Sequence, residues 1–495
     1  MGRGTVKWRT ASRRGRAPTP TAVLAVVTVA AALCTAGAAS TAAAAPGSEQ
    51  GSRTGAVPRG TTLGQRSWAS STPDPYAFAK DAKTVEGADG TTDAVRLEPG
   101  GTYRSSIKKD GKLYYRLELD ATSSAYVSAT AVPRLGTTVS SADGVKVTVQ
   151  DADGSTCSAE SAHLGPTQSP HPVTAWAARE IGSRSKYACQ EAGTYYAVVE
   201  RSGPPGSASD DWDLELDYAS EPRLREAGST AAPDTWNSAP PDTLLGDAGR
   251  RTGGMGFSTA VALRQGVWQT GIRAGQTLFY RVPVDWGQQL YATAELGSSP
   301  GGDGYVGTAL SMSLYNPAHG HVDDVGCGYD GSQRSAVLRP LPPVQYDNRY
   351  AITDRVSAMR FAGSYYLVVH LGAQVAEKFG DGPLGLTLRV RVNGTAEAGP
   401  AYAGQSQPRG AFDVSAQDRA EADAGTAGSG RAGGGGGGGG GGDSRADGSG
   451  GGDRTMKLVA AAGIGSGCVL VLTLALWRVV ARRRADGGWG ERTRA

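Results

Sequence analysis

The chain has 495 residues, a formal net charge of +3 and 39% hydrophobic residues. This length allows two or three domains. Acidic and basic residues nearly balance, with 50 Lys and Arg against 47 Asp and Glu, and no basic stripe runs through the central part. Nucleic acid is therefore not an expected partner.

The N-terminus has the order of a secretory signal peptide. Basic residues precede an apolar run over 21–33, and small residues follow. This order predicts a signal peptide over 1–44. An uncleaved anchor and a twin-arginine signal at Arg13 and Arg14 are the alternatives. The segment 45–84 is polar and rich in Pro and Gly, and we expect a disordered leader there.

An internal repeat is the most informative feature of the central part. Residues 113–120 (LYYRLELD) return 165 positions later as 278–285 (LFYRVPVD). Residues 192–199 (AGTYYAVV) return 170 positions later as 362–369 (AGSYYLVV). One constant offset followed by a second indicates a duplication with a small insertion.

Two homologous domains are therefore expected over 85–220 and 252–393, joined by a linker over 221–251. Apolar residues alternate with polar ones in both repeats, as over 145–149 and 384–392. A period of two predicts half-buried strands, and Asp-Gly and Gly-Gly pairs supply turns between them. The predicted fold class is all-β, with two tandem antiparallel jelly-roll-like β-sandwich domains.

The repeat motifs also suggest a family. Gly-Gly-Thr-Tyr, then Leu-Tyr-Tyr-Arg-Leu, then Ala-Gly-Thr-Tyr-Tyr-Ala-Val-Val resembles the bacterial pre-peptidase C-terminal (PPC) type of β-sandwich. The resemblance covers both repeats and rests on framework turns and strands. It implies accessory or binding modules of the kind that accompany secreted peptidases. This chain has two such modules and no room for a catalytic domain.

Three of the five cysteines fall in the repeats. At the offset of 170 residues, Cys157 and Cys189 correspond to Cys327 and Met359. We therefore predict a Cys157–Cys189 disulfide in an oxidising compartment, with Cys327 left as a free thiol or an intermolecular link. The alternative is that all three are buried thiols.

Two polar clusters are candidate metal sites. His319, His321 and Asp323 form a His-x-His-x-Asp motif, which can point two imidazoles at one zinc ion. Asp151 and Asp153 resemble the start of a calcium loop. Both patterns lack the further ligands that such sites need at their usual spacing. We interpret the histidine cluster as a solvated loop and the aspartate pair as a plain hairpin turn, and we predict no metal and no cofactor.

The C-terminal part is predicted to tether and anchor the chain. Residues 394–456 are rich in Gly, Ala, Ser and Asp, which favours a disordered tether. An apolar stretch follows, which predicts a transmembrane helix over 457–480. Arginines after it place the tail 481–495 in the cytoplasm. Gly463 and Gly467 form a Gly-x-x-x-Gly face that permits self-association.

These features predict a single-pass cell-membrane protein with its sandwiches outside. Metalloprotease and phosphate-loop motifs are missing from the sequence, which favours a non-enzymatic function in binding or scaffolding. The expected partner is an envelope protein or a cell-wall component. Two alternatives remain: a metal-dependent envelope enzyme or its direct regulatory subunit, and a glycan- or cell-wall-binding module. Four tryptophans are candidate glycan platforms, namely Trp176, Trp212, Trp268 and Trp286.

Overall fold

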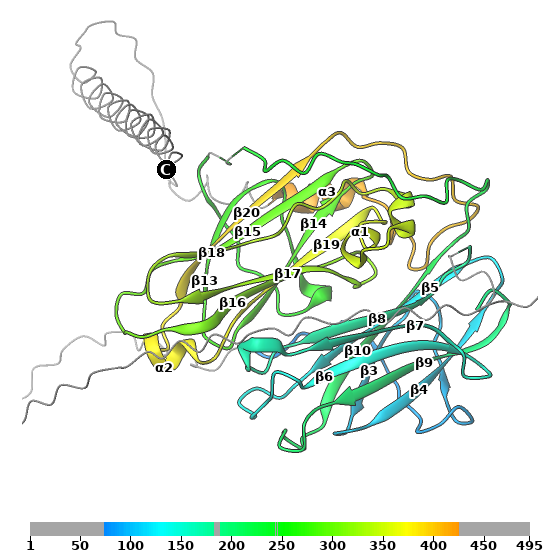
Figure 1. The fold of residues 1–495 in the computed structure, drawn as a ribbon, viewed down its shortest axis with the longest axis horizontal. Helices are drawn as coiled ribbons and strands as arrows, with labels where there is room; N and C mark the ends of the chain where they lie inside the picture. The colour runs from blue at the N-terminus through cyan, green and yellow to red at the C-terminus, as the bar shows by residue number, and fades with distance from the viewer. Residues whose placement is uncertain (1–73, 183–188, 243, 245, 425–495) are drawn as a thin grey trace, which may run out of the picture. The chain divides into compact units, whose positions relative to one another are not determined.

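The structure is a computed structural model that describes residues 74–182, 189–242, 244 and 246–424 (Figure 1). The predicted signal peptide, the transmembrane helix with Gly463 and Gly467, and the basic tail all lie outside the described residues. Among the residues that the structure describes, none of the helices has the length and apolar character that a membrane crossing needs.

The first repeat forms two five-stranded sheets that pack on one core (Figure 1). One sheet has the order β1 (Lys83–Thr84), β3 (Thr102–Ile107), β10 (Trp212–Glu221), β5 (Ser124–Val132) and β8 (Val173–Arg179). The other has the order β2 (Val95–Arg96), β4 (Lys112–Leu119), β9 (Gly193–Ser202), β6 (Gly144–Asp151) and β7 (Thr156–His163). A 3-10 helix, η1 (Gly165–Thr167), follows β7.

The second repeat has the same topology, strand for strand (Figure 1). One sheet is β11 (Gly249–Arg250), β13 (Gly266–Ile272), β20 (Leu384–Asn393), β15 (Gln289–Leu296) and β18 (Arg334–Val337). The other is β12 (Val261–Ala262), β14 (Thr277–Val284), β19 (Gly363–Leu371), β16 (Val306–Tyr315) and β17 (His321–Tyr329). The short helices of this part are η2 (Phe257–Thr259), η3 (Tyr346–Tyr350), α1 (Asp354–Ser357), α2 (Val375–Phe379) and α3 (Ala416–Ala424).

The prediction of two tandem β-sandwich domains is confirmed, with one difference in strand direction. The first strand of each sheet pairs parallel to its neighbour, as β1 does with β3, whereas the other ladders are antiparallel. The core follows the predicted alternation. On β4, Tyr115, Leu117 and Leu119 are buried while Arg116 and Glu118 between them are exposed. Burial of each such large side chain stabilises the sandwich by about 1.5–3 kcal/mol.

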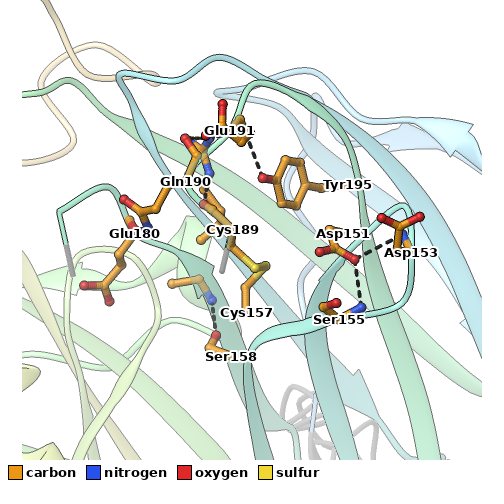
Figure 2. Close-up of a disulfide and its surroundings, with 12 residues drawn as sticks. Asp151, Asp153, Ser155, Cys157, Ser158, Glu180, Cys189, Gln190, Glu191 and Tyr195 are labelled. Carbon is orange, nitrogen blue, oxygen red and sulfur yellow. Dashed lines mark hydrogen bonds between the residues drawn. A yellow bond between two sulfur atoms is a disulfide. The ribbon is translucent and has the colours of Figure 1, made fainter. Parts of the chain in front are cut away.

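The predicted disulfide is confirmed. Cys157 on β7 and Cys189 before β9 are bonded across a sequence separation of 32 residues (Figure 2). Cys327 is a free, half-buried thiol. Its side chain packs against the core of the second sandwich, and burial raises the pKa of this thiol.

The predicted equivalence of Cys157 with Cys327 is wrong. β7 and β17 each contain a β-bulge, opposite the step after Val149 in the first sandwich and opposite the step after Leu314 in the second. These two residues pair with equivalent positions of β9 and β19, so the two bulges are equivalent. Val322 therefore occupies the place of Cys157, because the offset of 165 residues continues through β17.

The sequence predicts a disordered tether over 394–456, whereas the structure places residues 394–424 against both sandwiches. We call residues 394–424 the strap. Its backbone pairs with the end of the first sandwich, where the N–H of Gln407 donates to the carbonyl of Ser220 at 2.9 Å. Phe412 is only 1% exposed. The strap is ordered because it carries apolar anchors, and the rest of the predicted tether lies outside the described residues.

The end of the predicted leader is ordered for a similar reason. The hydroxyl of Tyr76 donates to the carboxylate of Glu215 on β10 at 2.7 Å. The Tyr76 ring also contacts Phe279 on β14 in an edge-to-face arrangement at 5.7 Å between centroids. Residues 74–84 thus contact both sandwiches and end in strand β1.

Candidate functional site

The two sandwiches meet at a buried polar junction. Glu221, at the end of β10, is 1% exposed and accepts two hydrogen bonds from Arg349 of η3, at 2.7 and 3.0 Å. The hydroxyls of Tyr126 and Tyr402 also donate to this carboxylate, each at 2.7 Å. Burial is the largest influence and would raise the pKa of Glu221, but the charge of Arg349 and the hydrogen bonds from Arg349, Tyr402 and Tyr126 together lower it. The ion pair is therefore fully formed at neutral pH.

An aromatic cluster surrounds this ion pair. Tyr126 stacks on Trp176 at 5.6 Å in the first sandwich, and Phe361 of the second sandwich stacks on Phe412 of the strap at 4.4 Å. Tyr126 and Phe361 meet edge to face at 5.1 Å. Aromatic pairs add about 0.5–1.5 kcal/mol each beyond their area burial. The first sandwich, the second sandwich and the strap therefore share one apolar core.

A groove of about 460 Å³ lies between the sandwiches beside this core. Its floor is the outer face of β16 and β17, where Ser311 and Ser313 alternate with core residues and Ser311 lies opposite Gly326. Its other wall comes from β7 and from residues 164–174 of the first sandwich. Serine has a small side chain and glycine has none, so the docked sandwiches leave a hollow there.

Two carboxylates in the groove differ in charge state. Burial raises the pKa of Glu160 on β7 to about 7, although His321 and a hydrogen bond with Trp176 act against this shift. Asp324 on β17 lies 3.4 Å from the Nε2 atom of His321, and this interaction lowers its pKa. Near neutral pH, Glu160 can donate or accept a hydrogen bond, whereas Asp324 is an acceptor only.

Two stacked histidines form one end of the groove wall. His171 of the first sandwich stacks on His370 of β19 at 4.4 Å between ring centroids. The Nδ1 atom of His171 lies 2.7 Å from the carbonyl oxygen of Ser169. Burial lowers the pKa of His171 to about 4 and lowers that of His370 well below its usual range. Among the described residues, the Nε2 atom of His370 has no hydrogen-bond partner.

The structure does not bring together the residues of the candidate zinc cluster. The Nδ1 atom of His319 faces Asp217 of the first sandwich at 3.3 Å, while His321 lies beside Asp324 in the groove. Asp323 is buried and pairs with Arg339. Over the described ranges, no group of three or more His, Cys, Asp or Glu side chains is arranged to hold a metal ion.

The candidate calcium loop forms a hairpin turn between β6 and β7, as the sequence predicts. The carboxylate of Asp151 accepts the N–H groups of Asp153 and Ser155 at 3.1 and 2.7 Å (Figure 2). These bonds close the turn from within, so the carboxylate holds the backbone. The turn is equivalent to the one that carries His319 in the second sandwich, because β6–β7 and β16–β17 are equivalent hairpins.

The candidate glycan platforms are not available at the surface, because all four tryptophan side chains are buried: Trp176, Trp212, Trp268 and Trp286. The structure instead exposes an aromatic ring at Tyr305, directly before β16. Sequence reasoning missed Tyr305, and it also missed Glu160, His171 and His370. A single local signal was present: Glu160 is the one acidic residue within a strand of small side chains, TCSAESAH.

No protein-family model matches the chain, and no curated protein matches it in sequence. Among solved structures, the CUB1-EGF-CUB2 domain of human MASP-1/3 is similar over 58% of this chain and 99% of that chain, with 8% identity and a TM-score of 0.14. The CBM22-1-CBM22-2 tandem of Paenibacillus barcinonensis Xyn10C covers 64% and 100%, with 13% identity and a TM-score of 0.16. Likenesses at these TM-scores carry no argument about function.

Proposed function

We propose that the chain is a non-enzymatic, membrane-anchored protein of the cell envelope. It presents two PPC-like sandwiches outside the membrane as a single head and binds an envelope component in the groove between them. The observation that carries this proposal is the groove of about 460 Å³ at the sandwich junction. Ligand sites of about 300–1,000 Å³ are common at such domain interfaces.

The walls of the groove support a binding function. Both sandwiches contribute to it, so a ligand would contact groups that only the docked pair brings together. The buried pair Glu221–Arg349 and the aromatic core beside it fix the two walls relative to each other. A groove with fixed walls loses little conformational entropy when a ligand binds.

The envelope location is supported by the sequence and by the disulfide. The predicted signal peptide and transmembrane helix place the sandwiches outside the cytoplasm. The Cys157–Cys189 bond fits an oxidising compartment. In the sequence, the strap follows β20 and is followed by the rest of the predicted tether, residues 425–456.

Site-specific photo-crosslinking in intact cells tests the binding function. A photoreactive residue at Ser311 would report from the floor of the groove. A matched control places the photoreactive residue at Lys146, which holds the equivalent position on β6. In the strand register, Lys146 lies opposite Glu200 of β9, just as Ser311 lies opposite His370 of β19. We expect Ser311 to crosslink to an envelope component and Lys146 to give none. Equal crosslinking from both positions, or none from Ser311, would contradict the proposal.

A further inference from the structure

Tyr305 is an exposed aromatic side chain directly before β16, and its ring lies against Gly328, which lines the groove. It is 64% exposed, one of four large hydrophobic residues that are exposed in the described part of the chain. The outer part of its ring, from Cε2 to the hydroxyl, lies where a Cβ atom at Gly328 would stand. Glycine at this position thus allows the ring to lie against β17 while most of its surface stays in solvent.

The groove floor continues from this ring along β17. From Asp324 to Gly328, even-numbered residues of β17 face the groove, because Val325 and Cys327 pack against the core. From Gly328 the floor passes Gly326, beside Ser311, and reaches Asp324, beside Ser313. Gly328 and Asp324 are four residues apart, or about 13 Å along the strand. The order is therefore an aromatic ring, hydroxyls and then a carboxylate.

The composition of the lining restricts the chemistry of the ligand. Of the described residues that line the groove, none is Lys or Arg. A phosphate or another strong anion would find no lysine or arginine there and would face the carboxylate of Asp324, which already pairs with His321. The floor of Ser311, Ser313, Gly326 and Gly328 also offers little apolar surface to a hydrophobic helix. These side chains instead favour an uncharged ligand with many hydroxyl groups.

We propose that the groove binds a neutral glycan chain, with Tyr305 as the stacking platform and Asp324, Glu160 and the serine hydroxyls as hydrogen-bond partners. This inference rests on the proposed function and names the ligand class for the same groove. A pyranose ring has an apolar face that packs on an aromatic ring and hydroxyls at its rim that both donate and accept. The distance of about 13 Å along β17 accommodates more than one ring.

The side chain of His370 supports this assignment. His370 lines the groove, and only 2% of its surface is exposed. Among the described residues, its Nε2 atom has no hydrogen-bond partner. Its Nδ1 atom lies 3.0 Å from the hydroxyl of Thr277. A sugar hydroxyl can serve either tautomer of the imidazole, because it is both donor and acceptor.

Calorimetric titration of the full chain in nanodiscs tests the proposal. The probes are chitotetraose and cellotetraose, two neutral glycans with different substituents, and purified peptidoglycan in a pull-down. We expect at least one probe to bind and Tyr305→Ala to weaken binding by roughly tenfold or more, as for other aromatic anchors. Tyr305→Phe keeps the ring and should change binding by less than about threefold. Ser311→Leu fills the floor and should also abolish binding.

The matched control is Tyr114→Ala, which removes an aromatic ring from the outer face of the first sandwich and should leave binding unchanged. Failure of all three probes to bind would overturn the glycan assignment, and so would unchanged binding by Tyr305→Ala. If the probes fail while Ser311 still crosslinks to an envelope protein, the proposed function stands and only the ligand class is wrong.

Discussion

Arg349 and Glu221 form a two-point ion pair across the junction of the two sandwiches, with their side chains 5% and 1% exposed. One partner ends the last strand of the first sandwich, and the other lies in an insertion of the second. Since Tyr402 of the strap also donates to Glu221, three parts of the chain share this carboxylate. The pair is the polar centre of the junction.

Arg349→Met should strongly destabilise the folded chain. Removal of one partner leaves Glu221 buried without its cation, which typically costs about 3–5 kcal/mol. Chemical denaturation of the purified chain would measure this change in the free energy of unfolding. Arg334→Met is the matched control, since Arg334 pairs with Asp330 at the surface and should cost less than about 1 kcal/mol. Similar losses from both variants would contradict the assigned role of the junction pair.

The strap should contribute to stability through Phe412. Phe412→Ala removes a buried ring that stacks on Phe361, and truncation of a buried Phe costs about 3–5 kcal/mol. Hydrogen exchange should also show protection at Gln407, whose N–H bonds to Ser220. Fast exchange there, together with a small effect of Phe412→Ala, would indicate that the strap is not docked.

The stability of the chain should depend on pH through His171. Its native pKa of about 4 lies below its ordinary value of about 6.5, so the native state binds fewer protons than the unfolded state between these values. The contribution of neutral His171 to the free energy of unfolding is therefore fully present above pH 6.5 and is lost as the pH falls toward 4. Between pH 7 and pH 4.5, the free energy of unfolding of His171→Gln should therefore fall by about 2 kcal/mol less than that of the wild type.

Glu160 should have the opposite dependence. Its native pKa of about 7 lies above its ordinary value, so the native state takes up this proton first as the pH falls from 7 toward 4.5. Glu160→Gln should stabilise the chain at pH 8 and have little effect at pH 4.5. Denaturation of both single variants over this pH range separates the two contributions. Parallel pH profiles for wild type, His171→Gln and Glu160→Gln would refute both assignments.

The purified chain should not hold stoichiometric zinc at the His-x-His-x-Asp motif. His319 faces Asp217 and Asp323 pairs with Arg339, so zinc binding would have to break both interactions. Metal analysis of protein from zinc-supplemented cultures measures this directly. Stoichiometric zinc that disappears in His319→Ala would instead favour the metal-dependent enzyme or its regulatory subunit.

The strands and the core could be predicted from the sequence because their signals are local. The alternation at Val145, Val147 and Val149 places all three in the core, as predicted. The disulfide could be predicted for a related reason, since the repeat limits which cysteines can pair. The docking of the strap could not be predicted from the sequence. Its anchors Tyr402 and Phe412 are two residues within a long segment whose average composition indicates disorder.

The groove could not be predicted from local sequence patterns. Glu160 and Asp324 lie in strands of different sandwiches, and they line one groove only because the sandwiches dock. That docking depends on contacts such as Tyr126 with Phe361 and Glu180 with Arg360, whose partners are far apart in the sequence. The motif at His319 was visible locally, but its neighbours from the first sandwich determine its partners.

Proteolysis of intact, wall-stripped cells tests the central claim most directly, namely that a membrane tether holds both sandwiches outside as one unit. We expect external protease to cut the predicted tether after residue 424. It should release one soluble fragment that contains both sandwiches and the strap. Release of the two sandwiches as separate fragments, or full protection until the membrane is permeabilised, would contradict the account.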